Sequence, residues 1–436
     1  MNSNFYLLIY AAVALSFVAW HVSRRRTRHQ AEVGQMLEAE KAGLNEPPSL
    51  HPVVDTNRCI GSGACARACP EGALGVVNGK ATLINAASCI GHGACAAACP
   101  VQALTLVFGT EKRGIDIPHI SKDFETNVPG VFIAGELGGM GLIRKTAEQG
   151  RQAMAAIRKR SSGHSAAHDV VIIGAGPAGI SAGLSAIFHQ LRYKLIEQES
   201  SLGGSVYHYP RNKLAMTAPV KLDLIGTVRL GTEVQKEKLL AFWHEVVAKT
   251  SLTMNFNERF EGLDSRPDGT YDVRTSRGVY HTRSVLLALG RRGTPRKLGV
   301  PGEETPKVMY RLADAEQYTG RAMLVVGGGD SALEAAIALA AEPGTTVTLS
   351  YRGEAYARVK EKNRSQLAEQ VQAGRIRSLL KSRVVEIDEA SATLALADGE
   401  TEILANDYVI VCAGGELPTP LLKSIGIRFE TKFGKA

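Results

Sequence analysis

The sequence predicts an α/β protein made of two doubly wound domains, a small α+β domain and one N-terminal transmembrane helix. Three observations predict this fold class. Two glycine-rich turns each lie between an apolar strand and a small-residue helix. Two cysteine-rich segments begin thirty positions apart, and an uncharged apolar run of eighteen residues lies near the start of the chain. With 436 residues, the chain has room for about three domains of ~150 residues each.

Charge and composition exclude several function classes. The formal net charge is +8, but the basic residues do not form one stripe, so we expect no nucleic-acid partner. The sequence has no Ser-His-Asp-like set, no H-E-x-x-H motif and no nucleophile elbow, and it names no catalytic acid or base. His189, His208 and His281 are isolated in the sequence, and we interpret them as structural or solvated side chains.

Residues 5–22 form the apolar run, with His21 counted as neutral. The run is at the short end of what crosses a bilayer. Arginines follow at positions 24, 25, 26 and 28, and the positive-inside rule places that side in the cytoplasm. We therefore expect a single-pass anchor in the inner membrane, with the catalytic part cytoplasmic. A cleaved signal peptide is the alternative, but it needs a basic start, which residues 1–4 lack. Residues 23–50 are expected to form a polar helical stalk.

Residues 51–108 contain six of the seven cysteines, in two segments of the same spacing. Each segment has the register C-x2-C-x2-C-x3-C-P with its second cysteine replaced, by Ser62 in the first segment and by His92 in the second. Soft thiolates at this spacing select iron–sulfur clusters. A zinc module is the weaker alternative, since three thiolates in each segment suit it poorly. The seventh cysteine, Cys412, follows an apolar run and is interpreted as a small core residue.

This segment resembles a bacterial two-cluster ferredoxin over its whole length. The resemblance implies crossed ligation, in which the last cysteine of each run binds the other cluster. One cluster would then use Cys59, Cys65 and Cys99, and the other Cys89, Cys95 and Cys69.

The cluster type stays open at this point. Three thiolates suffice for a 3Fe–4S cluster. Alternatively, His92 completes a 4Fe–4S cluster, because an imidazole can replace a thiolate and raises the reduction potential. Ser62 could also bind through oxygen, although hard oxygen suits iron of this kind less well. We include His92 among the metal-binding residues.

Residues 168–303 begin with the first glycine-rich turn. The strand at 169–173 leads into Gly174, Gly176 and Gly179, a helix, a second strand and Glu197. This is the complete G-x-G-x-x-G pattern of a Rossmann-like dinucleotide-binding domain. The glycines let a pyrophosphate reach the helix N-terminus, and Glu197 binds the ribose hydroxyls.

Residues 304–408 contain the second turn. Here Gly327, Gly329 and Ala332 lie between the strand at 322–326 and a helix. Arg352 follows the next strand where an acid would favour NAD, and an arginine there accommodates the 2′-phosphate of NADP. We expect NADPH, with NADH as the alternative.

The order of the two turns, with the segment 289–295 between them, resembles the thioredoxin-reductase-like flavoproteins over residues 168–430. The resemblance implies FAD at the first site, with Gly204 and Gly290 among its binding residues, and NAD(P)H at the second. Those disulfide reductases carry a C-x-x-C pair, but no cysteine occurs here between Cys99 and Cys412. The ferredoxin–NADP reductases of this fold therefore fit better.

The last motif of that family occurs here in an unusual place. Its form T-x-x-P-G-V-F-x-A-G-D appears as residues 126–136, ahead of the first glycine-rich turn, and includes Gly135 and Glu136. Glu136 replaces the usual aspartate. We interpret residues 109–160 as a circularly permuted piece of the FAD domain, to which residues 409–436 return. A segment that completes a second subunit is the alternative.

The expected function is a membrane-anchored, NAD(P)H-dependent iron–sulfur flavoprotein oxidoreductase, because a flavin connects two-electron nicotinamides with one-electron clusters. Its unknown acceptor would be a redox partner protein or a quinone, and a homodimer is compatible with it. Two alternatives are a redox-sensing or assembly protein that uses the clusters as a signal, and a flavin monooxygenase-like enzyme.

Overall fold

The structure is a computed structural model. It describes residues 3–41, 46–47, 50–111, 113–139, 141–160, 166–231, 233–291, 293–356 and 359–434; the side chains of residues 3–9 and of Thr294 are not among those described. The chain divides into two compact units. One contains residues 1–114, 355–364 and 432–436, and the other contains residues 115–354 and 365–431.

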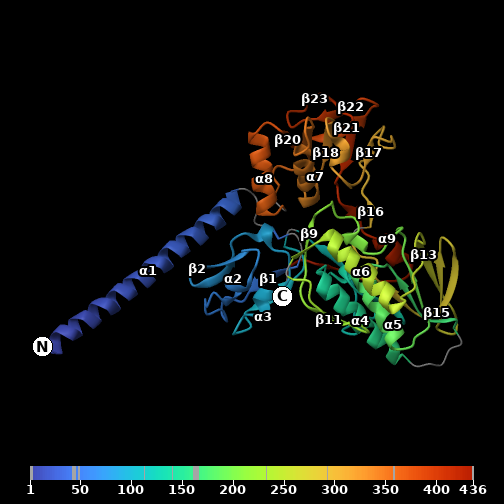
Figure 1. Cartoon of the computed structure of the whole chain (residues 1–436), viewed down its shortest axis with the longest axis horizontal. Coiled ribbons are helices and arrows are strands. Elements are labelled where there is room, and N and C mark those ends of the chain that lie inside the picture. The colour runs from blue at the N-terminus through green and yellow to red at the C-terminus, as the bar shows by residue number, and fades with distance from the viewer. Residues whose placement is uncertain are drawn as a thin grey trace. The chain divides into compact units, whose positions relative to one another are not determined.

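The first unit begins with the long helix α1 (Ser3–Lys41), blue in Figure 1. The helix continues without a break through the arginines at 24–26, so the expected anchor and stalk form one element. Its second half packs on the cysteine-rich module. The buried carboxylate of Glu32 accepts hydrogen bonds from the Val76 backbone N–H (2.8 Å) and from Arg28 Nε (2.9 Å), and Ala39 packs against Ala87.

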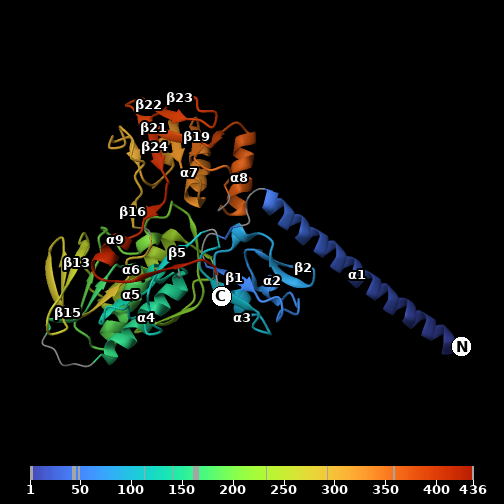
Figure 2. The ribbon, with the colours of Figure 1, turned by 180° about the vertical axis from the view of Figure 1, so that it is seen from behind.

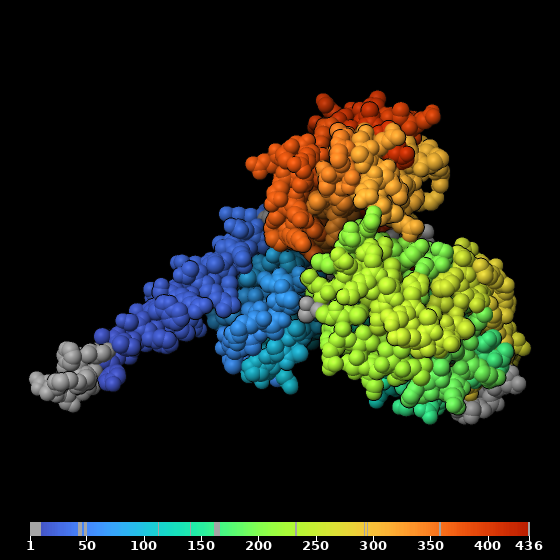
Figure 3. All heavy atoms as spheres, viewed as in Figure 1, coloured from blue at the N-terminus to red at the C-terminus, as the bar shows by residue number. Residues whose placement is uncertain are grey.

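From Tyr10 onward, the first half of α1 is exposed, as the blue helix in Figure 3 shows. Tyr10, Val13 and Phe17 are among its exposed apolar side chains. Within the described residues, no helix combines the length and the apolar character that crossing a bilayer requires. The transmembrane helix expected at residues 5–22 is therefore not supported by the structure. Part of that segment, residues 5–9, lies outside the described side chains.

The cysteine-rich module is built from two similar halves. Strand β1 (His51–Val54) pairs antiparallel with β4 (Leu104–Val107), so the two ends of the module meet. Strands β2 (Leu74–Val77) and β3 (Lys80–Leu83) form a hairpin through Asn78 and Gly79, which both have positive φ, as a two-residue hairpin turn requires. The short helices are α2 (Ala64–Ala68), η1 (Ala86–Ser88) and α3 (Ala94–Ala97).

The second unit contains two parallel sheets. In the first, β7 (His168–Ile173) lies between β8 (Tyr193–Ile196) and β15 (Gly278–Leu287), and β13 (Phe260–Ser265) and β14 (Tyr271–Thr275) extend it as an antiparallel meander. Strand β6 (Val131–Ile133) pairs parallel with β15, with Val131 opposite Val285. The segment that precedes the first glycine-rich turn is thus part of the same sheet in the same chain.

Two helices cover this sheet side by side in both views, α4 (Ile143–Lys159) and α5 (Pro177–Phe188) (Figures 1 and 2). Ala147, Ala153 and Met154 of α4 are fully buried in one core with Ile172 and Ile180. The amphipathic pattern of α4 explains this docking, because its charged residues lie away from the core. The other elements of this part of the unit are β5 (Ile115–Pro118), η2 (Glu136–Gly138), η3 (Gly204–Val206), β9 (Leu214–Met216), β10 (Val220–Leu222), β11 (Gly226–Val228), β12 (Glu233–Gln235) and α6 (Lys236–Thr250).

The second sheet has the order β17-β24-β18-β19-β20, and all of its strands are parallel. Its strands are β17 (Val308–Met309), β18 (Ala322–Val326), β19 (Thr346–Tyr351), β20 (Ile376–Leu380) and β24 (Tyr408–Val411), with helices α7 (Asp330–Ala340) and α8 (Glu361–Gln372). Because β24 pairs with β18 as far as Val411, this sheet extends beyond the boundary expected at residue 408. Cys412 follows the strand and is half-buried, so it is not the core residue that its apolar surroundings predicted.

The remaining elements complete the second unit. Strands β21 (Arg383–Ile387), β22 (Ser391–Ala395) and β23 (Thr401–Ala405) form an antiparallel sheet, β16 (Thr294–Pro295) pairs with β25 (Gly415–Glu416), and β26 (Phe429–Lys432) pairs with β5. The short helices are η4 (Glu316–Tyr318) and α9 (Thr419–Ser424). Leu422 of α9 is buried in the core that contains Val131, so the chain returns to the first sheet after the second.

Candidate functional site

The cysteines of the module lie close enough for the charge of one to change the pKa of another. Burial raises the pKa of Cys65, and the charges that raise it further belong to Cys59 and Cys99. Burial raises the pKa of Cys89 to about 11, with further increases from Cys69 and Cys95. These neighbours match the two sets that crossed ligation implies, and the charge of Cys65 also acts on Cys95 of the other set.

Backbone amides in the module are placed to stabilise thiolates. The N–H groups of Ala66, Gly91 and Ala96 lower the pKa of Cys65, Cys89 and Cys95 respectively, against the larger effect of burial. Hydrogen bonds to sulfur are a general feature of iron–sulfur sites.

Glycines allow the backbone segments of the module to approach one another closely around the cysteines. At Gly61, a Cβ would lie 2.2 Å from the carbonyl oxygen of Gly79, and at Gly91 it would lie 2.5 Å from that of Leu50. Both residues have positive φ, which glycine adopts readily. The donor set and the backbone therefore fit iron–sulfur clusters.

The set of Cys69, Cys89 and Cys95 lies around a pocket. His92 and Glu71 line the same pocket, together with Pro52, Ala73, Leu74, Ile90, Gly91, Gly93 and Leu106. Within the described residues, no group of three or more His, Cys, Asp or Glu side chains closes on a single metal ion.

The first glycine-rich turn of the second unit is shaped for a phosphate group. Gly174 has φ +108°, and a Cβ there would lie 2.5 Å from the carbonyl oxygen of Ala288; at Gly179 it would lie 1.7 Å from that of Gly174. Gly176 is the N-cap of α5 and has Pro177 after it. Gly204 faces it, since a Cβ on Gly204 would lie 2.9 Å from Gly176 Cα. Side chains are therefore excluded from the helix N-terminus, where a pyrophosphate binds.

Glu197 lies at the end of β8, beside this turn. Its Oε2 accepts a hydrogen bond from the Ala175 N–H (2.6 Å), and its Oε1 accepts one from the Glu199 N–H (3.0 Å). Burial raises the pKa of this carboxyl, although the two amides act in the opposite direction. The carboxylate is thus fixed against the turn, which is the position predicted for a ribose-binding acid.

Gly135 and Glu136 follow β6 at the same edge of the first sheet. The Gly135 N–H donates to Gln149 Oε1 (2.8 Å), and a Cβ on Gly135 would lie 3.1 Å from Ala178 Cβ. Burial raises the pKa of Glu136, while the charge and backbone N–H of Arg291 lower it. Burial also raises the pKa of Tyr209, and the negative charge of Glu136 adds to this.

Arg291 and Tyr209 are residues that the sequence analysis did not assign to the site. Arg291 lies directly after Gly290, whose φ is +66° and whose Cα has open space around it. A polar residue next to a motif glycine could have indicated Arg291. Nothing in the sequence around Tyr209 indicated its place near Glu136.

The second glycine-rich turn has the same construction. A Cβ on Gly327 would lie 2.5 Å from the carbonyl oxygen of Cys412, Gly329 is the N-cap of α7 with open space around it, and Ala332 is fully buried. Arg352 follows β19 and is exposed. The predicted residues therefore lie at the carboxyl ends of β18 and β19, where ligands bind in open α/β sheets.

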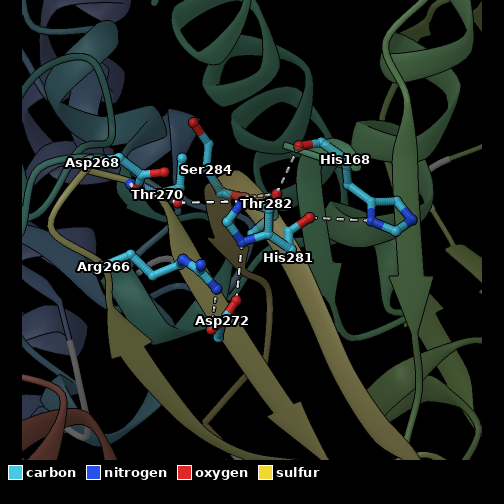
Figure 4. Close-up of polar contacts among 8 residues, drawn as sticks. All are labelled: His168, Arg266, Asp268, Thr270, Asp272, His281, Thr282 and Ser284. Atoms are coloured by element: carbon cyan, nitrogen blue, oxygen red, sulfur yellow. Dashed lines mark hydrogen bonds and ion pairs between the residues drawn. The ribbon is translucent and has the colours of Figure 1, made fainter. Parts of the chain in front are cut away.

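The three histidines that are isolated in the sequence each have a polar neighbour in the fold, which agrees with a structural role. His281 Nδ1 lies 3.0 Å from Asp272 Oδ1, which ties β15 to β14, and Arg266 binds the same carboxylate (Figure 4). His208 Nε2 lies 3.3 Å from Glu199 Oε1, and His189 Nδ1 lies 3.3 Å from Arg158 Nη1. The His281 network also includes His168, Asp268, Thr270, Thr282 and Ser284 (Figure 4). The His281 contacts connect neighbouring strands, the His189 contact connects the ends of α4 and α5, and none of these contacts resembles a nucleophile–base pair.

Comparisons with known proteins agree with both parts of this site. A family model described as pyridine nucleotide-disulphide oxidoreductase matches residues 171–434, and a model described as 4Fe-4S dicluster domain matches residues 51–100. The bacilliredoxin reductase Bdr of Bacillus subtilis is 28% identical over 270 residues, which are 61% of this chain and 82% of that protein.

A second relative and a solved structure are also similar to the flavoprotein part of the chain. A ferredoxin–NADP reductase of Geobacillus thermodenitrificans is 30% identical over 192 residues, 42% of this chain and 54% of that protein, so the chain spans about half of its length. The solved structure of the bacillithiol disulfide reductase Bdr from Bacillus cereus has a TM-score of 0.54 at 26% identity, covering 59% of this chain and 81% of that one.

These matches confirm the expected cofactors, FAD, NAD(P)H and two iron–sulfur clusters, and the expected oxidoreductase class. They cover the two dinucleotide-binding turns and both cysteine segments. The chain belongs to the pyridine nucleotide-disulphide oxidoreductase family and carries a 4Fe–4S dicluster domain ahead of its flavoprotein part.

Proposed function

We propose that this protein passes electrons between NAD(P)H and an outside one-electron acceptor, through FAD and its iron–sulfur clusters. Nicotinamides exchange two electrons together, clusters exchange one, and a flavin can do both. The observation that carries the proposal is the presence, in one chain, of two cysteine sets suited to clusters and a two-site flavoprotein with no cysteine between Cys99 and Cys412. Because the chain has no dithiol beside the flavin, the clusters are the groups of this chain that would accept single electrons from it.

The chain's residues hold and orient the nucleotides in this proposal. The glycine-rich turns at the starts of α5 and α7 expose backbone N–H groups to phosphates, and Glu197 receives the ribose of the first nucleotide. Arg352 receives the 2′-phosphate of the second, which would make NADPH the preferred donor. The acceptor would be a redox partner protein or a quinone.

An anaerobic titration of the full-length protein with NADPH tests the proposal. We expect the absorbance of flavin and clusters to bleach together. In Cys65→Ala the flavin should still be reduced, while cluster bleaching and NADPH-dependent quinone or cytochrome reduction fall. Thr105→Ala, at an exposed site of the same module, is the matched control and should behave like wild type. Clusters that dithionite reduces but NADPH does not would instead favour the redox-sensing alternative.

We also propose that the first half of α1 attaches the protein to the cytoplasmic face of the inner membrane. Exposed apolar side chains, including Val13, Phe17 and Trp20, are followed by the arginines at 24–26, a pattern that suits anionic lipid headgroups. Membrane fractionation of the full-length protein tests this attachment. Val13→Glu with Phe17→Glu should shift the protein to the soluble fraction, and a wild-type protein found only in that fraction would contradict the proposal.

A further inference from the structure

The two cysteine segments differ most at the position of their missing cysteine. Ser62 and His92 each stand three residues after the first cysteine of their segment, where the run C-x2-C has its second ligand. The structure gives these two side chains opposite surroundings.

His92 faces the cysteine set of the second segment. It lines the pocket that Cys69, Cys89 and Cys95 also line. Its Nε2 is buried and, within the described residues, has no hydrogen-bond partner. Leaving such a nitrogen buried and unpaired destabilises the fold, and a bond to iron would remove that cost. Glu71 lines the same pocket, so a water-bridged contact to its carboxylate is the competing use of this nitrogen.

Ser62, in contrast to His92, is exposed and hydrogen-bonded. Its Oγ accepts a hydrogen bond from the Ala64 N–H (3.4 Å), and its carbonyl oxygen accepts one from Arg67 Nη1 (3.2 Å). The second segment has Ala97 where the first has Arg67, so this bond to the turn has no counterpart there. Both contacts hold the Ser62 turn at the surface, and a hydroxyl is in any case a harder ligand than iron–sulfur clusters usually take.

We propose that the two segments hold different clusters: Cys69, Cys89, Cys95 and His92 bind a 4Fe–4S cluster, and Cys59, Cys65 and Cys99 bind a 3Fe–4S cluster. Three thiolates match three irons in the first site, and the imidazole supplies the fourth ligand in the second. The inference rests on the iron–sulfur part of the proposed function, and it is independent of the acceptor and of the direction of electron flow.

Pulsed electron paramagnetic resonance tests the His92 ligand. Full-length protein labelled with ¹⁵N-histidine is reduced anaerobically with dithionite, so the result does not depend on NADPH or on any acceptor. We expect a strongly coupled imidazole nitrogen in the reduced 4Fe–4S spectrum, and its loss in His92→Ala. His92→Cys should restore a four-iron spectrum at a lower potential, since imidazole ligation raises the potential. Glu71→Gln is the control and should keep the nitrogen coupling.

A four-iron spectrum that is the same in wild type and His92→Ala, without nitrogen coupling, would overturn the assignment. A wild-type spectrum without nitrogen coupling would overturn it as well, because Nε2 would then serve the Glu71 carboxylate rather than the iron.

Iron content and the oxidised spectrum test the first site. Anaerobically reconstituted wild type should contain about seven irons per chain and show the signal of an oxidised three-iron cluster. Ser62→Ala should leave both unchanged, whereas Ser62→Cys should raise the content to about eight and remove the three-iron signal. About eight irons in wild type, falling in Ser62→Ala, would overturn the three-iron assignment. Dithionite-reducible clusters that NADPH cannot reduce would leave this inference intact and count only against the proposed function.

Discussion

Gly150 of α4 packs directly against the backbone of Ala178 in α5. A Cβ on Gly150 would lie 2.1 Å from the Ala178 carbonyl oxygen and 2.9 Å from its carbonyl carbon, so the close approach of the helices requires a glycine. Ala178 belongs to the first glycine-rich turn, and Gly150 belongs to the segment ahead of it in the chain. Residues 131–159 thus support the helix whose N-terminus forms the first dinucleotide site. This contact supports the proposal that residues 109–160 are a permuted piece of the FAD domain.

Gly150→Ala should weaken the binding of FAD. The new methyl group meets backbone atoms that cannot rotate away, and overpacking of this kind costs about 1–3 kcal/mol. We expect a lower melting temperature and faster FAD release, measured by flavin fluorescence. Gly34→Ala, on α1 with open space around its Cα, is the control and should keep FAD as wild type does. FAD retention equal to wild type in Gly150→Ala would contradict the supporting role of α4.

Asp169→Asn should make the free energy of unfolding depend less on pH in the acid range. Burial alone would raise the pKa of Asp169, but hydrogen bonds from Arg192 and the charge of Arg283 outweigh it and hold the pKa below its ordinary value near 3.8. Because the folded state favours the ionised form, this stabilisation is present above that value and is lost as pH falls through the folded-state pKa. Charge-assisted hydrogen bonds of this kind contribute about 1.5–3 kcal/mol.

Unfolding of Asp169→Asn by urea at several pH values measures this effect. The deficit against wild type should be full at neutral pH and should shrink in the acid range. Asp264→Asn is the matched control, because its ion pair with Arg274 (2.7 Å) is exposed and such pairs contribute only about 0–1 kcal/mol. If the loss of unfolding free energy in Asp169→Asn is the same at every pH, ionisation of Asp169 does not stabilise the folded state.

Glu136→Ala should weaken FAD binding more than Glu136→Gln does. Removing the carboxylate takes one of two nearby negative charges from the half-buried Arg291, whereas glutamine still offers an oxygen to the Arg291 N–H. Loss of a charge-assisted hydrogen bond predicts about a tenfold or larger rise in the FAD dissociation constant for alanine. Fluorescence titration of wild type and both variants with FAD measures the dissociation constants. Equal constants in the three proteins would show that Glu136 does not contribute to FAD binding.

Arg352→Ser should change the preference between nicotinamides. Arg352 is exposed at the carboxyl end of β19, and losing a charged contact to a 2′-phosphate should raise KM for NADPH about tenfold or more while leaving that for NADH unchanged. Steady-state kinetics with both donors is the measurement. Arg375→Ser is the control, since Arg375 is exposed at the amino end of β20, away from the ligand-binding edge. An equal effect on both donors would refute a 2′-phosphate contact.

The cofactor-binding motifs of this protein could be recognised without a structure, because each motif is local. The glycines at 174, 176 and 179 must allow close backbone contacts within one turn, and the cysteine spacing must wrap a short loop around a cluster, so both can be recognised without a fold. The distant residues that join these motifs depend on how the chain folds, and local patterns do not indicate them. The fold brought Cys69 to Cys89, Arg291 and Tyr209 to Glu136, and β6 to β15.

The surroundings of single side chains were likewise decided by packing. Sequence gives Ser62 and His92 the same register, and only burial separates an exposed hydroxyl from a buried nitrogen without a described partner. The same holds for Cys412, whose apolar run predicted a core residue although the strand ends just before it. Burial depends on which elements pack around a residue, and that is a property of the whole fold rather than of the local pattern.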